Sequence, residues 1–231
     1  MKRKTTVHTP TSSLEESKDF YRRLKFEMLS EEDPTMFTDG KALIEIDPDR
    51  FARAGIKIYS EDLAGKAGEL KEHQEIIDIE NGFLLSDPNG VKVYLINEWL
   101  EIDHQPKEKS FGLTGNFAGL SIEAHDINKT ADFWTALGFS HKDGDLDQGW
   151  ATFSDGEGFD ISLMKSLMCP HLFFNPGMTY FNGGKNLTNI GLLREAGIPI
   201  TEEITVFSSD NVADNVIIRD PGGLGFFIFN D

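Results

Sequence analysis

The sequence has only one cysteine, Cys169, so no disulfide can form within the chain. A chain without internal disulfides is typical of a protein that folds in a reducing compartment. The sequence also lacks any run near the roughly 20 consecutive apolar residues that a membrane-spanning helix needs. Its basic start, residues 1–4, is followed by a polar stretch rather than by the apolar core of an export signal. These absences predict a cytoplasmic protein.

Basic residues are also scarce. The 22 Lys and Arg residues stand against 39 Asp and Glu residues, which gives a formal net charge of −17. Nucleic acid and anionic membrane surfaces would repel such a protein, so neither is expected as a partner. Hydrophobic residues make up 39% of the chain and aromatic residues 11%, enough to build packed cores. We therefore expect a globular protein whose partner is a small molecule.

The chain contains an internal duplication. Residues 14–26 (LEESKDFYRRLKF) align with residues 127–139 (INKTADFWTALGF), and both end on Leu-x-Phe. Residues 86–97 (SDPNGVKVYLIN) align with residues 219–230 (RDPGGLGFFIFN), and both open on Asp-Pro-x-Gly. Two matched blocks in the same order indicate a repeat.

The repeat predicts the domain organisation. We expect one domain over residues 1–100, a polar linker with a proline over 101–112, and a second domain over 113–231. The segment around 166–177 has no counterpart in the first half and predicts an insertion in the second domain. Each half also divides again, with modules at about 4–48 and 53–98 in the first.

Hydrophobic patterning predicts the same element order in every module: strand, helix, strand, strand, strand. The density of Gly, Pro and Asp turns favours antiparallel strands with helices covering one sheet face. The fold class expected is therefore α+β.

This order and the quoted blocks resemble the vicinal-oxygen-chelate superfamily, which includes glyoxalases, bleomycin-resistance proteins and dioxygenases. The resemblance implies four βαβββ modules paired into two glyoxalase-like domains, each with a curled, mixed or antiparallel sheet that forms a cup. In the enzymes of that superfamily, the cup holds a divalent metal. Its ligands come from the first and fourth strands of each module and suit zinc, nickel, iron or manganese.

The resemblance also locates the family's ligand positions in this sequence. They fall on Thr6, Glu45, Gly55 (or Ala54) and Tyr94 in the first domain, and on Gly119, Ser162 (or Asp160), Thr179 and Phe227 in the second. In the first domain only Glu45 carries a metal-binding side chain, and in the second at best one position does. None of the six histidines (8, 73, 104, 125, 141 and 171) falls on an equivalent position. We expect no metal cofactor, with a divalent metal at a partial site as the alternative.

Two residues of the first cup are catalytic candidates. His8 lies two residues after Thr6, on the same face of its strand, and could form an acid–base or residual metal pair with Glu45. The other interpretation is a polar pair that lines a pocket. Thr6 and Tyr94 are candidate ligand-binding residues, although an aromatic side chain such as Tyr94 equally suits core filling.

The second half is rich in aromatic residues. Strand alternation would place Phe117 on one face with Gly119, Ser121 and Glu123. If that face lines the cup, the pocket is apolar with a few polar points, as small-molecule sites usually are. The aromatic residues could equally fill the cup. The candidate ligand-binding residues here are Ser121, Glu123, Trp150, Thr179 and Phe227.

Three functions follow from these observations. The leading one is a metal-independent protein that binds a small, partly apolar molecule in a sheet cup. The first alternative is an enzyme of lyase, isomerase or dioxygenase type with an atypical metal or acid–base site around His8 and Glu45. The second is an interaction module with filled cups. The expected assembly is a monomer or a homodimer.

Overall fold

The computed structural model describes residues 2–61, 63–71 and 75–231, so His73 lies outside the described residues. The first half contains β1 (Lys4–Pro10), α1 (Leu14–Arg23), β2 (Glu27–Ser30), β3 (Thr35–Thr38), β4 (Leu43–Asp47), β5 (Gly55–Tyr59), α2 (Ala64–Lys71), β6 (Ile77–Ile79), β7 (Gly82–Ser86) and β8 (Lys92–Ile96).

The second half has the same order, with one short 3₁₀ helix added. It contains β9 (Asn116–Ala124), α3 (Ile127–Ala136), β10 (Ser140–Asp145), η1 (Leu146–Gln148), β11 (Trp150–Ser154), β12 (Asp160–Lys165), β13 (Gly177–Phe181), α4 (Asn186–Glu195), β14 (Ile200–Ile204), β15 (Asn215–Arg219) and β16 (Gly225–Phe229). The predicted βαβββ order therefore occurs four times. None of the described helices is long and apolar enough to cross a membrane.

The strands form two eight-stranded mixed sheets, which confirms the predicted fold class. The first sheet has the order β2-β3-β4-β1-β5-β8-β7-β6, and the second has the equivalent order β10-β11-β12-β9-β13-β16-β15-β14. In the first sheet, β1 and β5 run antiparallel at the centre, and each pairs in parallel with the fourth strand of its own module. Each sheet takes its strands from one predicted domain, whereas the domain boundaries themselves stay a prediction.

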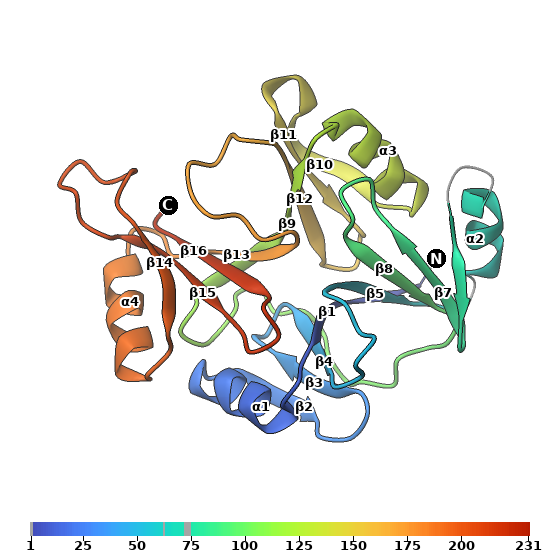
Figure 1. Ribbon diagram of the computed structural model, residues 1–231, viewed down its shortest axis with the longest axis horizontal. Coiled ribbons are helices and arrows are strands. Elements are labelled where there is room, and N and C mark those ends of the chain that lie inside the picture. Colours follow the sequence, from blue (N-terminus) through green and yellow to red (C-terminus); the bar gives the residue numbers. More distant parts are fainter. Residues whose placement is uncertain (1, 62, 72–74) are drawn as a thin grey trace.

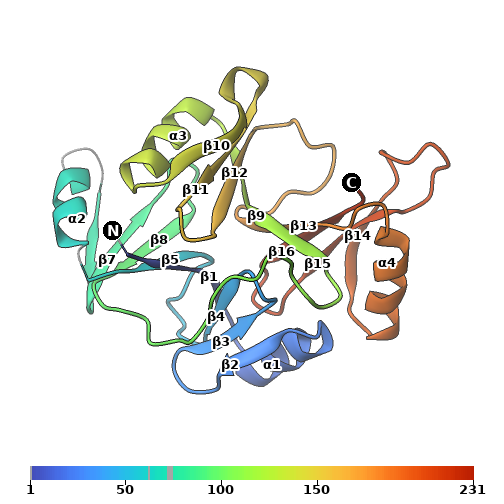
Figure 2. The same cartoon turned by 180° about the vertical axis from the view of Figure 1, so that it is seen from behind.

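Helices α1 and α3 begin where the sequence offers a capping side chain. Ser13 accepts a hydrogen bond from the backbone N–H of Glu16 at the start of α1, and Asp126 accepts one from Lys129 at the start of α3. In Figures 1 and 2 the four helices lie at the periphery, one beside the strands of each module.

Both halves contribute to one hydrophobic core. A single cluster of buried side chains includes residues of both sheets and of all four helices or their flanks. Phe20 and Tyr21 of α1 reach across to the other half, where both rings lie within about 6 Å of the Phe226 ring on β16. The two halves are therefore held together by packing that neither could complete alone.

The Asp-Pro-x-Gly turns have a second role, which the sequence did not reveal. The buried Asp220 carboxylate accepts hydrogen bonds from the hydroxyls of Thr9 (2.8 Å) and Tyr21 (2.9 Å) in the first half. In the matching turn of the first half, Asn89 donates both to Asp87 and to the Thr130 hydroxyl of α3, at 3.0 Å each. The two turns thus start the last strand of each half and also join the halves.

Asp220 makes the stability of this junction depend on pH. Burial raises the pKa of Asp220 from its ordinary value of 3.8 to about 6, although hydrogen bonds from Thr9, Tyr21 and the backbone act in the opposite direction. Between about pH 4 and pH 6, the folded protein therefore binds more protons at this site than the unfolded chain does. The contribution of Asp220 to stability falls as the pH rises through that window.

We predict that Asp220→Asn removes this dependence. The difference in free energy of unfolding between wild type and variant should change by on the order of 3 kcal/mol between pH 4 and pH 7, with the wild type losing more. Urea denaturation at a series of pH values measures it. If the difference in free energy of unfolding between wild type and variant stays constant from pH 4 to pH 7, Asp220 keeps an ordinary pKa in the folded protein.

Candidate binding site in the first sheet

The polar candidate site lies on one face of the first sheet, which we call the first cup and define by His8, Glu45, Lys57 and Tyr94. The parallel register of β1 and β4 pairs His8 with Glu45. The parallel register of β5 and β8 pairs Lys57 with Tyr94. Because side chains alternate along a strand, these four residues and their neighbours two positions away share this face.

Glu45 is bonded through both carboxylate oxygens. The Lys57 ammonium forms an ion pair with Oε1, and the Tyr59 hydroxyl donates to Oε2 at 2.6 Å. The Glu45 side chain is only 3% exposed, so its charge is balanced inside the protein rather than by water. Burial and the Glu45 charge together raise the pKa of Tyr59 well above its ordinary range, so its hydroxyl stays protonated as a donor.

The His8 side chain bonds to Asp47, although the strand register places His8 opposite Glu45. The fully buried imidazole has Nε2 2.9 Å from Asp47 Oδ2 and Nδ1 2.8 Å from the carbonyl oxygen of Arg53. Both ring nitrogens therefore lie within hydrogen-bond distance of an oxygen atom. Burial on its own would raise the pKa of Asp47, but hydrogen bonds from His8 and the Asp49 backbone, with the charges on His8 and Lys57, lower it to about 2.

The remaining candidates of the first cup are also buried. Tyr94 packs its ring edge-on against His8, with ring centroids 4.7 Å apart, and its hydroxyl accepts the backbone N–H of Arg53 at 3.1 Å. Thr6 is fully buried opposite Lys57, and its hydroxyl has no hydrogen-bond partner among the described residues. Direct contact of either side chain with a ligand stays a prediction.

The donor set of the first cup does not fit a divalent metal as it stands. Donor atoms of His8, Glu45 and Asp47 lie within 4.8 Å of one another, and imidazole plus two carboxylates is a chemically reasonable set. Lys57, however, contacts both carboxylates, at 3.7 Å from Asp47 Oδ2 and closer to Glu45. A metal ion would have to displace this ammonium before it could bind the carboxylates.

A cavity of about 610 Å³ opens above this cluster. Glu45, Asp47, Lys57 and Tyr59 face it, whereas the buried His8 does not line it. Its walls include two prolines and one isoleucine, and its lining holds six carboxylates against the single ammonium of Lys57. Four of those carboxylates are exposed and form no ion pair within the described part of the chain: Asp33, Asp49, Glu80 and Glu98.

The opposite end of the first cup is covered by the linker. Leu100 is buried and Ile102 half-buried in a small apolar cluster with Met36, Leu43 and Tyr94. The Lys4 ammonium of β1 donates to the carbonyl oxygens of Leu100 and Ile102 and so ties the linker to the sheet edge. The linker thereby covers part of the cup at the end away from Glu45.

The second cup, the face of the second sheet that carries Ser121, Thr179 and Phe227, is filled. The predicted insertion folds over it, and the rings of Phe173 and Phe174 lie 4.9 and 6.2 Å from that of Phe227, which is 1% exposed. Ser121 and Thr179 hydrogen bond to each other at 2.6 Å.

The remaining candidates on the second sheet are Glu123 and Trp150. Glu123 holds the insertion through its side chain, which accepts the backbone N–H of Leu167 at 2.9 Å. His171, within the insertion, packs against Phe227 and Phe229, and burial lowers its pKa. Trp150 is 41% exposed on β11.

The expected position of Phe117 was wrong. A register shift between Thr179 and Tyr180 interrupts the pairing of β9 with β13. The extra residue turns the Phe117 side chain away from the second cup into the shared core, where its ring lies 5.5 Å from that of Tyr180. Strict alternation misplaced it because a β-bulge reverses the faces beyond it.

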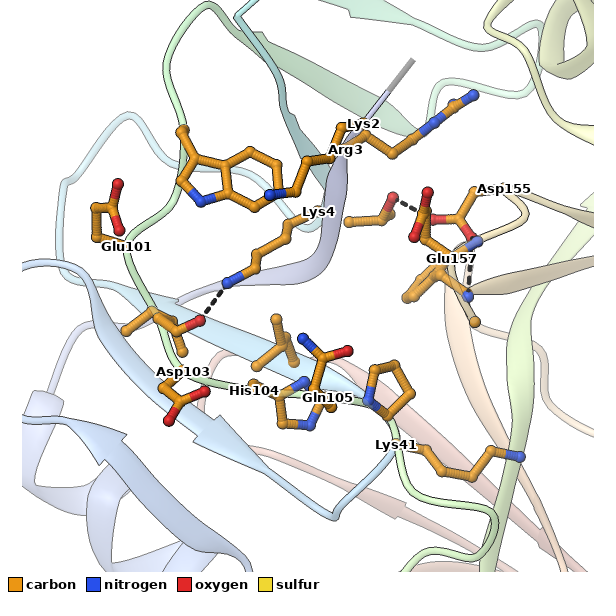
Figure 3. A pocket seen from close by; sticks show the side chains of 17 residues that line it. Lys2, Arg3, Lys4, Lys41, Glu101, Asp103, His104, Gln105, Asp155 and Glu157 are labelled. Carbon is orange, nitrogen blue, oxygen red and sulfur yellow. Dashed lines mark hydrogen bonds between the residues drawn. The ribbon is translucent and has the colours of Figure 1, made fainter.

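A further cavity, of about 460 Å³, lies where the start of β1, the linker and the second half meet (Figure 3). Its lining holds four basic side chains and four carboxylates, so their charges balance. Three of the basic groups are bonded to backbone: Lys4 to the linker, Arg3 to the carbonyl oxygens of Leu137 and Gly138, and Lys41 to that of Phe117. This cavity belongs to the junction between the halves.

The comparisons with known proteins agree with this architecture. No family model matches the sequence, and no curated protein matches it. Three similar structures, each 14% identical, are the 2,3-dioxygenase LapB from Pseudomonas sp. KL28 (TM-score 0.57, covering 98% of this chain and 91% of that one), homoprotocatechuate 2,3-dioxygenase from Arthrobacter globiformis (0.60, 98% and 78%) and the Mn(II)-bound glyoxalase from Novosphingobium aromaticivorans (0.55, 97% and 80%).

The chain has the vicinal-oxygen-chelate fold. The predicted fold of paired βαβββ modules is thereby confirmed along nearly the whole chain. At 14% identity, the likeness concerns the fold, and the chemistry of the first cup has to be argued from its own side chains.

Sequence reasoning missed three residues of the first cup: Asp47, Lys57 and Tyr59. The signal was present, because alternation from Glu45 places Asp47 on the same face, and alternation from Gly55 places Lys57 and Tyr59 there. These three residues lie beyond Glu45 and Gly55, the ligand positions that the family resemblance indicates on their strands.

We predict strong coupling between Lys57 and Glu45. Lys57→Met should lower the free energy of unfolding by about 3 kcal/mol, because it leaves the buried Glu45 carboxylate without its cation. In a Glu45→Gln background the same change should cost less than about 1 kcal/mol. A double-mutant cycle by urea denaturation tests this, and additive effects would contradict the buried pair.

We also predict that the insertion seals the second cup. Replacing both Phe173 and Phe174 by alanine should expose Phe227 and increase the fluorescence of an apolar reporter dye. Phe51→Ala, at a side chain that is 75% exposed in the first half, is the control and should leave the signal unchanged. Equal dye signals from both variants would mean that the insertion does not cover the cup.

Proposed function

We propose that this protein binds a small, partly apolar organic cation in the first cup, without a metal cofactor. One observation carries the proposal: the cavity of about 610 Å³ is lined by six carboxylates and one ammonium, with apolar walls between them. A cavity of this size lies in the range of small-molecule sites. The excess of carboxylates attracts cationic ligands and repels anionic ones.

The polar floor supports a binding role without a metal. Lys57 supplies positive charge to Glu45 and Asp47, and Tyr59 keeps a protonated hydroxyl at the base of the cavity. A ligand amine would then pair with the exposed carboxylates at the rim, while its apolar part packs on Pro34 and Ile96. The predicted cytoplasmic location and the small assembly, monomer or homodimer, belong to the same proposal.

The burial of His8 argues against the enzymatic alternative in the form that the sequence suggested. A general base has to lie within hydrogen-bond reach of the proton that it removes. His8 is fully buried and bonded through both nitrogens, and it faces Asp47 rather than the cavity. The interaction-module alternative fits the filled second cup, whereas the open cavity of the first cup favours ligand binding.

A matched series of ligands tests the proposal. With wild-type protein in EDTA, 4-phenylbutylamine should bind, its alcohol analogue should bind more weakly, and 4-phenylbutyrate should not bind; isothermal titration calorimetry measures all three. Asp49→Asn and Glu98→Gln should each weaken amine binding about two- to fivefold at low salt. Asp132→Asn, an exposed carboxylate on α3, is the control.

The charge preference is the decisive readout. Equal binding of the amine and the carboxylate would contradict the proposal, and so would amine binding that Asp49→Asn and Glu98→Gln leave unchanged. Loss of binding in EDTA, restored by a divalent metal, would show that the site needs a metal.

A further inference from the structure

The floor of the first cup is a compact set of alternating charges. The Lys57 ammonium contacts Glu45 and Asp47, and Asp47 also contacts His8. The Lys57 ammonium thus lies against both carboxylates, in the place where a cation would compensate their charge.

The same atoms would form a metal site if the ammonium were absent. Donor atoms of His8, Glu45 and Asp47 lie within 4.8 Å of one another and come from two strands that pair in register. A neutral imidazole and two carboxylates are ligands that zinc and other first-row divalent ions accept. The β1–β4 pairing already holds these three side chains together, so little rearrangement would be needed.

We infer that Lys57 is a resident substitute for a divalent cation, and that His8, Glu45 and Asp47 form a latent metal site which Lys57 keeps closed. The family resemblance indicated Thr6 and Glu45 as ligand positions. His8 lies two residues after Thr6, and Asp47 lies two residues after Glu45. The latent site is thus a new combination on the same strands. The inference concerns the cluster beneath the cavity and does not depend on the ligand proposed above.

Removing the Lys57 charge tests the inference. Lys57→Met should bind one Zn²⁺ per chain at least tenfold more tightly than wild type, measured by isothermal titration calorimetry with Zn²⁺ alone. Adding His8→Ala to Lys57→Met should return Zn²⁺ binding to the wild-type level, because it removes the imidazole ligand. Lys142→Met is the matched control, since it removes a lysine paired with Asp160 in the second half and should bind Zn²⁺ as wild type does.

Because Lys57→Met leaves Glu45 without its partner, Lys57→Gln is the second variant, and the rise of its melting temperature with Zn²⁺ is the second measurement. A rise in Lys57→Gln that wild type lacks supports the inference. Tight stoichiometric Zn²⁺ binding by wild type would overturn it, and so would folded Lys57 variants that bind Zn²⁺ no better than wild type. The amine-binding experiment uses wild type in EDTA, so its failure would leave this result untouched.

Discussion

The packing of the two sheets and their helices on one shared core is the constraint on which the rest of the structure depends. A βαβββ module has one apolar helix face and one apolar sheet face, and it does not bury both by itself. Phe20 and Tyr21 of α1 therefore pack on Phe226 of the other half. Asp220 and Asn89 add hydrogen bonds between the halves, so that each half completes the other.

In each sheet one face packs on the shared core, so the side chains on the opposite face can differ between the two halves. In the second sheet, the insertion covers Phe227 with its own aromatic rings, and the cup becomes a second small apolar core. In the first sheet, the linker covers only one end, and the charged end around Glu45 stays open to solvent. The second cup is filled and the first is partly open because different segments of the chain cross them.

The charges of the first cup show how the buried carboxylates of this chain are balanced. A buried carboxylate needs a compensating charge, and either a metal ion or an ammonium meets that need. Here Lys57 meets it for Glu45 and Asp47. The exposed carboxylates at the rim form no ion pair with any residue that the structure describes, which gives the cavity its negative character.

The sequence predicted the local and periodic features well. The repeated Asp-Phe-aromatic helix and the Asp-Pro-x-Gly turns identified the fold, because such motifs describe short-range geometry and core packing. Glu45 and His8 were also correctly expected on one face, since alternation along β1 and β4 is a local property. Phe117 was misplaced because the bulge near Thr179 depends on pairing between strands that lie about 60 residues apart.

By itself, the sequence determined the βαβββ repeat, the absence of disulfides within the chain, the negative net charge and the residue types at the expected ligand positions. Each of these depends on composition or on spacing within one segment. Only the tertiary structure decided that Lys57 lies between Glu45 and Asp47, that His8 turns to Asp47, and that the insertion fills the second cup. These are contacts between distant segments, set by strand register and by the way the chain packs over its sheets.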